Sequence, residues 1–147
     1  MNLEHAAALT PCLVVLVLPG WSLWRMVKGL RAGDWRRPAW FGHATWASFF
    51  LMVLAWLWGL AAGPALQSLA EKCSIRHHQP YDDAYYQAHR DDYHRLFPLS
   101  SRCNADYDLV PAWVNPAIAV FFLLLLLSIA GLVWTSAHRS TVKGNSP

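Results

Sequence analysis

The chain has 147 residues, of which 55% are hydrophobic and 14% are charged. A typical soluble domain carries about 25% charged residues, so charge is scarce here. Three long runs hold no Asp, Glu, Lys or Arg at all: His5–Trp24, Pro38–Ala70 and Leu109–His138. A soluble protein of this size cannot bury so much uncharged surface in one core, which excludes the soluble globular, disordered and secreted disulfide-only classes. The composition predicts an integral membrane protein.

The first run predicts a kinked membrane span over about residues 7–27. A helix needs about 20 apolar residues to cross the hydrocarbon core, and Pro19 interrupts this one. We expect Arg25 at its end to reach the headgroups. A secretory signal peptide is the alternative, but such a leader carries its positive charge before the apolar core. Here Glu4 precedes the core and the basic residues follow it, which favours a retained anchor.

Two further spans follow. The second covers residues 38–64 and ends at Pro64, because proline cannot continue a hydrogen-bonded helix. The third covers about residues 112–136, with Asn115 as its N-cap and Pro116 as its first helical residue. Only helices and closed barrels satisfy their backbone in lipid, and these runs lack the alternation of barrel strands, so the predicted fold is all-α. We divide the chain into a first span with its basic loop (1–37), a second span (38–64), an outer loop (65–111) and a third span with its tail (112–147).

The basic residues predict the orientation of the chain. Lys and Arg near the ends of spans mark the cytoplasmic face, and five of them lie between the first two spans. We therefore expect a plasma-membrane protein with its N-terminus and long loop outside and its C-terminus in the cytoplasm. Orientation and lipid contact explain this cluster without a regulatory lipid site or a nucleic-acid partner. The five residues are Arg25, Lys28, Arg31, Arg36 and Arg37.

The cysteines predict one disulfide. Cys73 and Cys103 lie in the long outer loop, on the oxidising side of the membrane where disulfides persist. A bridge that closes a loop of about 30 residues stabilises a protein by about 3–4 kcal/mol in the chain-entropy model. Cys12 falls within the first span, where we expect an inert apolar residue.

A short amphipathic helix is predicted over Asp82–Phe97 in the outer loop. Asp82 and Asp83 lie at its start and Arg95 lies near its end, which suits the helix dipole. One face is aromatic, and either caps the outer ends of the spans, lies on headgroups, or docks another protein. This predicted aromatic face consists of Tyr85, Tyr86, His89, Tyr93 and Phe97.

The same loop is rich in His and Asp, which suits zinc or copper. His89 and His94 are five positions apart, however, or about 140° around a helix, and cannot share one ion on it. No HExxH or CxxC pattern occurs in the chain. We therefore assign no metal site. The candidates that remain open are His77, His78, His89, Asp92 and His94.

Motifs for a cofactor or for catalysis are equally weak. His43 and His138 both fall on the cytoplasmic side, where two histidines in a helical bundle can ligate haem, although interfacial histidine needs no ligand. Ser100 and Ser101 have no base placed by any motif, and nothing resembles a phosphate loop or a nucleophile elbow. We predict no cofactor and no catalytic residue, and the balance favours a protein that is not an enzyme.

Small residues in the second span predict close helix packing. Ala55, Gly59 and Gly63 form a small-xxx-small ridge, whose partner is either this chain or another subunit. With the aromatic face, this ridge predicts a non-catalytic accessory or scaffold subunit of bacterial type that binds a larger membrane or envelope protein. The alternatives are an extracytoplasmic metal-binding or metal-handling membrane protein, and a haem-bearing redox membrane subunit.

Overall fold

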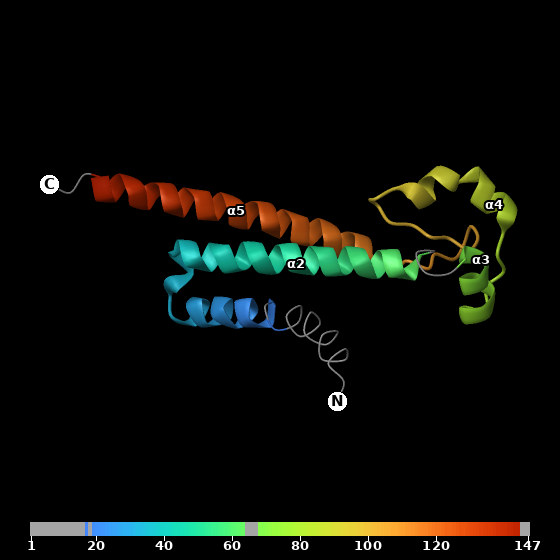
Figure 1. Ribbon diagram of the computed structural model, residues 1–147, viewed down its shortest axis with the longest axis horizontal. Coiled ribbons are helices and arrows are strands. Elements are labelled where there is room, and N and C mark those ends of the chain that lie inside the picture. Colours follow the sequence, from blue (N-terminus) through green and yellow to red (C-terminus); the bar gives the residue numbers. More distant parts are fainter. Residues whose placement is uncertain (1–16, 18, 64–67, 145–147) are drawn as a thin grey trace, which may run out of the picture. The chain divides into compact units, whose positions relative to one another are not determined.

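The computed structural model describes residue 17, residues 19–63 and residues 68–144, with side chains as far as Arg139 (Figure 1). Most of the predicted first span, including Cys12, lies outside these described residues. Residues 19–31 are helical. Every regular element in the described part of the chain is a helix or helical turn, which confirms the all-α prediction.

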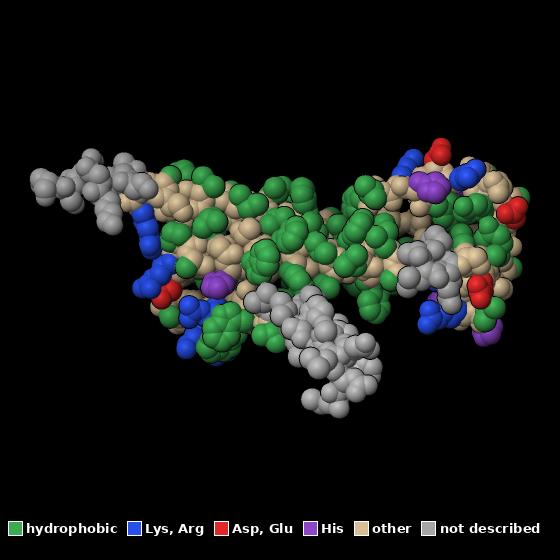
Figure 2. Space-filling view, viewed as in Figure 1, with side chains coloured by type: hydrophobic (Ala, Val, Ile, Leu, Met, Phe, Trp, Pro, Cys, Tyr) green, Lys and Arg blue, Asp and Glu red, His purple; other side chains and the backbone are tan. Residues whose placement is uncertain are grey.

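Two long apolar helices correspond to the predicted second and third spans. They are α2 (Pro38–Ala62) and α5 (Val114–Gly144). By length and composition, all of α2 and the Val114–Arg139 part of α5 could each cross a membrane. The most apolar window of α2 is only 28% buried and that of α5 only 11% buried, whereas the core helix of a soluble protein is mostly buried. Figure 2 shows the apolar side chains that cover both helices.

The start of α5 differs from the prediction. The helix begins at Val114, and Asn115 does not cap it. Instead, the Asn115 side chain accepts a hydrogen bond from the Leu99 amide and donates one to the Leu99 carbonyl, both at 2.8 Å. The predicted N-cap was wrong because the amide side chain pairs with a backbone segment distant in sequence, which local spacing does not reveal.

The chain forms two compact units, to both of which α2 and α5 contribute. The first comprises Met1–Leu51 and Phe121–Pro147. Within it, the helical residues 19–31 are followed by Gly33, whose φ of 73° is a left-handed conformation that glycine adopts without steric cost. The 3-10 turn η1 (Asp34–Arg36) then leads into α2.

The second unit, Met52–Val120, contains the outer loop. Its short elements are α3 (Leu69–Glu71), the π-helical turn η2 (Lys72–Arg76), α4 (Asp83–Ala88) and the 3-10 helix η3 (Arg90–His94). The predicted disulfide is confirmed. Cys73 and Cys103 are bonded, with their Cα atoms 5.7 Å apart.

The predicted helix over Asp82–Phe97 is divided in two. α4 starts after Asp82, whose side chain accepts a hydrogen bond from the Tyr85 amide at 3.0 Å, and His89 separates it from η3. The rings of Tyr86 and Tyr93 lie 4.8 Å apart. Residues seven positions apart on a straight helix are separated by about 10 Å along its axis. The break therefore lets both tyrosines pack together, and tertiary packing overrides the helical pattern.

Candidate functional site

The disulfide forms the centre of a small core in the outer loop. Cys73 and Cys103 are fully buried and pack with Leu69 and Leu109. Four tyrosines pack against this cluster, and two of them belong to the predicted aromatic face. They are Tyr81, Tyr86, Tyr93 and Tyr107. Two of the five residues of that aromatic face, Tyr86 and Tyr93, therefore pack against the loop's own core.

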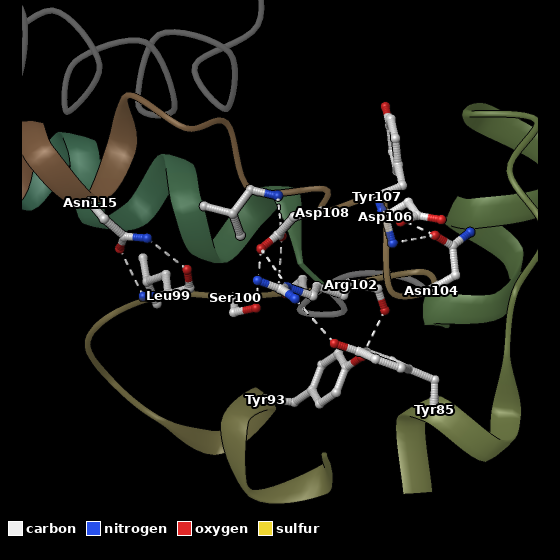
Figure 3. Close-up of polar contacts among 12 residues, drawn as sticks. Tyr85, Tyr93, Leu99, Ser100, Arg102, Asn104, Asp106, Tyr107, Asp108 and Asn115 are labelled. Carbon is white, nitrogen blue, oxygen red and sulfur yellow. Dashed lines mark hydrogen bonds and ion pairs between the residues drawn. The ribbon is translucent and has the colours of Figure 1, made fainter. Parts of the chain in front are cut away.

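Asp108 orders the segment that contributes Cys103 and Leu109 to this core (Figure 3). Its carboxylate accepts hydrogen bonds from the amides of Ser101 and Val110 at 2.9 Å each, and from the Ser100 hydroxyl at 3.1 Å. An isolated antiparallel bridge joins Asp108 to Arg102. Hydrogen bonds to a charged acceptor contribute about 1.5–3 kcal/mol each, so this carboxylate fixes the backbone around residues 100–110.

Arg102 connects this segment to α4 and η3. Its Nη1 donates to the Tyr85 hydroxyl at 3.1 Å, and the Tyr93 hydroxyl donates to the Arg102 carbonyl at 2.7 Å (Figure 3). The hydrogen bond to Tyr85 raises the pKa of Arg102, and burial raises the pKa of Tyr93 to about 12. Both groups therefore hold their protons at neutral pH, and Arg102 presents a permanent positive charge.

A pocket of about 280 Å³ opens beside these residues. Its two arginines each lie near a carboxylate: Arg95 Nη1 is 3.2 Å from Asp92 Oδ1, and Arg102 Nε is 3.9 Å from Asp108 Oδ2. The side chains of Arg95 and Arg102 are 60% and 48% exposed, so both ion pairs are screened by water and weak. The pocket is lined by Tyr85, His89, Asp92, Tyr93, Arg95, Pro98, Ser100 and Arg102.

The pocket lining suits an anionic group. A guanidinium donates parallel hydrogen bonds to a carboxylate or a phosphate, and Arg95 and Arg102 are each partly exposed beside one carboxylate of this chain. The His89 ring stacks on Tyr85 with centroids 4.1 Å apart, which forms a flat aromatic wall. The Ser100 hydroxyl donates a hydrogen bond to Asp108.

Lys72 has a role that the sequence did not reveal. Its side chain is 4% exposed, and its ammonium donates to the carbonyls of Ala61 at 2.8 Å, Ala62 at 3.5 Å and also Gly63. These carbonyls form the C-terminal end of α2, where they lack partners within the helix and carry partial negative charge. Burial, together with the nearby Arg76 charge, lowers the pKa of Lys72. Nothing in the local sequence distinguishes Lys72 from the other basic residues of the outer loop.

The predicted small-residue ridge packs against this same chain. Ala55 is 5% exposed. A Cβ added at Gly59 would lie 2.5 Å from Leu99 Cδ1 and 2.9 Å from Val114 Cγ1, and one added at Gly63 would lie 2.5 Å from Ser101 Oγ. In this chain Gly59 and Gly63 therefore lie close to residues of the second unit, of which Leu99 and Ser101 belong to the outer loop.

The remaining predicted residues are dispersed. Phe97 is 52% exposed, and the His77 ring nitrogen lies 3.1 Å from the Tyr107 hydroxyl. His78 and His94 are exposed. Among the described residues, no three His, Cys, Asp or Glu side chains gather as a metal would require, so the metal-binding alternative gains no support. His43 lines a separate basic cavity in the first unit.

No protein-family model, curated protein or solved structure matches this chain. The proposals below therefore rest on the geometry of the chain itself.

Proposed function

We propose that the chain is a small multi-pass protein of the plasma membrane that serves as a non-catalytic accessory subunit. In this proposal α2 and α5 are two of three spans, and the first span covers about residues 7–27. The exposed apolar surfaces of α2 and α5 support a lipid setting. The basic residues before α2 support a cytoplasmic location for that end, with the disulfide-bonded loop outside.

The observation that carries the accessory role is an exposed apolar pair beside the arginine-lined pocket. Leu96 is 71% exposed and Phe97 is 52% exposed, and the flanking Arg95 and Pro98 both line the pocket. Apolar anchors next to an arginine are typical of protein interfaces. We propose that Leu96 and Phe97 contact an apolar surface of the partner, while Arg95 binds one of its carboxylates.

The position of Leu96 and Phe97 near the end of α2 indicates what kind of partner can contact them. The Trp56 indole donates a hydrogen bond to the Leu96 carbonyl at 3.1 Å. Trp56 lies in the last two turns of α2, roughly 9 Å from its end at about 1.5 Å per residue. If α2 spans the membrane, Leu96 lies at the outer boundary of the bilayer. The proposed partner is therefore another membrane protein.

Photo-crosslinking in the native host tests this proposal. A photoreactive phenylalanine analogue at Phe97 is expected to give one discrete protein adduct, and the same analogue at the exposed His78 is the control. Arg95→Gln is expected to weaken the adduct at position 97 several-fold, because it removes the charge without touching the disulfide core. Lipid adducts alone at position 97, or the same protein adducts from position 78, would contradict the accessory role.

A further inference from the structure

A basic cavity of about 340 Å³ lies in the first unit, between residues 19–31 and the start of α2. Figure 2 shows Lys and Arg side chains gathered near the turn that joins these two helical segments. The sequence predicts these cations on one side of the membrane but gives no sign that they line a cavity. The cavity is lined by Arg25, Lys28, Gly29, Ala32, Asp34, Arg37, Ala39, Trp40 and His43.

Trp40 and Gly29 build the wall of this cavity. The Trp40 indole donates a hydrogen bond to the Met26 carbonyl at 3.0 Å, which fixes the ring against the preceding helical segment. A Cβ at Gly29 would lie 2.8 Å from Trp40 Cδ1, so only glycine allows this approach without displacement of the ring. The packing of Trp40 against Gly29 therefore forms one wall of the cavity.

Positive charge in the cavity exceeds negative charge. Asp34 is the only acidic residue among the described residues of the first unit, and its Oδ1 lies 3.0 Å from Arg37 Nε. Arg25 and Lys28 thus have no carboxylate to pair with in the described part of that unit. The Lys28 ammonium instead lies 4.8 Å from the centre of the Trp24 ring. Cations that lack an internal counter-ion create a site for an external anion.

We infer that this cavity binds the phosphate group of an anionic phospholipid. Phosphate oxygens are strong acceptors for Arg and Lys, and a tryptophan at the end of a span lies at headgroup depth. Basic pockets between spans on the cytoplasmic side bind anionic headgroups in this way. The inference rests on the proposed membrane setting. It also goes beyond orientation, because orientation requires charge but not a cavity lined by that charge.

Native mass spectrometry of the full-length protein in detergent tests the inference. Phosphatidylglycerol is titrated against phosphatidylcholine, and one phosphatidylglycerol molecule is expected to bind most tightly. Lys28→Gln should weaken that site about fivefold, the effect of one basic residue near an anionic lipid. Lys28→Arg should retain binding because it keeps the charge. Arg31→Gln is the matched control, since Arg31 is exposed, lies on the same helical segment and does not line the cavity.

Three outcomes would overturn the inference. Equal weakening by Lys28→Gln and Arg31→Gln would indicate diffuse attraction rather than a site. Equal binding of the two lipids would show that the negative headgroup is not recognised. Competition by glycerol 3-phosphate at the same concentration as the lipid would identify a soluble phosphate as the ligand. A protein that stays in solution without detergent would instead contradict the membrane setting itself.

Discussion

Lys72 places a buried ammonium at the C-terminal end of α2, where it donates to three main-chain carbonyls. Three donors meet three acceptors, so the amine is fully hydrogen-bonded in the protein. Burial alone disfavours a charged amine, and the lowered pKa of Lys72 reflects that cost. The helix end offsets it, because its unpaired carbonyls attract positive charge. One residue thereby joins the outer loop to the end of the second predicted span.

Replacing Lys72 should therefore destabilise the loop and the helix end together. Lys72→Met keeps most of the side-chain volume but leaves the carbonyls of residues 61–63 without this donor. We expect a loss of about 1–3 kcal/mol, the cost of an unsatisfied buried polar group. Arg76→Met is the matched control, because Arg76 is exposed in the same turn. Thermal unfolding in detergent measures the difference, and equal melting temperatures for the two variants would contradict the capping role.

The raised pKa of Tyr93 predicts that the stability of the protein depends on pH. Burial raises its pKa from 10.0 to about 12, so the folded protein holds a proton that the unfolded chain releases. Its contribution to stability is complete below pH 10.0 and is lost as the pH rises to about 12. We expect the melting temperature of the wild type to fall more steeply over this interval than that of Tyr93→Phe. Parallel curves of melting temperature against pH for the two proteins would contradict this role of Tyr93.

Lys72 and Tyr81 also have shifted pKa values, but both are present in each protein compared. The contribution of Lys72 therefore cancels in the difference between wild type and Tyr93→Phe, whereas the charges of Tyr81 and Arg102 interact with Tyr93, so that part of their contribution belongs to the Tyr93 effect. Below pH 10.0 a constant offset of about 1 kcal/mol is expected, because the variant lacks the hydrogen bond from Tyr93 to the Arg102 carbonyl.

At the scale of elements, glycines in α2 differ in what surrounds them. Gly59 faces Leu99 and Val114, whereas nothing lies within 4 Å of a Cβ added at Gly42. Gly59→Ala should therefore destabilise the protein by about 1–3 kcal/mol through overpacking. Gly42→Ala should be neutral or slightly stabilising, because alanine favours the helix. The unfolding midpoints of the two variants measure this difference. If both variants unfolded at the wild-type midpoint, the close packing around Gly59 would be contradicted.

The packing around Gly59 and Gly63 also limits what substitutions in the ridge can show about function. Because Gly59 and Gly63 contact residues of the same chain, a substitution there disturbs folding before it disturbs any partner. The accessory role is better tested at Phe97, which is exposed.

For the whole molecule, the proposed orientation predicts which residues face each side of the membrane. In a Cys12→Ser background, an impermeant maleimide should label Ala105→Cys in intact cells. It should label Ala32→Cys only after the membrane is permeabilised. Both alanines are exposed, so accessibility within the protein does not limit either reaction. Labelling of Ala32→Cys in intact cells would contradict the orientation.

The native cysteines provide an internal control for the same experiment. Cys73 and Cys103 are bonded and fully buried, so neither should react before reduction. Reaction of both without reductant would contradict the disulfide.

The helical class, the two described span-length helices and the disulfide followed from the sequence alone. Each depends on a local property: an uninterrupted apolar run, or two cysteines alone in one loop. The dipeptide Gly63-Pro64 also predicted the end of α2, whose last residue is Ala62. Such features are encoded over short stretches, so the composition and spacing of neighbouring residues are enough to predict them.

The pocket, the basic cavity and the environment of each polar side chain were decided only by the tertiary structure. Asn115 binds Leu99 rather than capping α5, and Lys72 binds the end of α2 rather than solvent. The predicted helix at Asp82–Phe97 breaks so that Tyr86 can pack on Tyr93. Each of these outcomes depends on contacts between residues that are not neighbours along the chain. Periodicity along the sequence carries no information about such contacts, because they are selected by packing and by the need to satisfy buried polar groups.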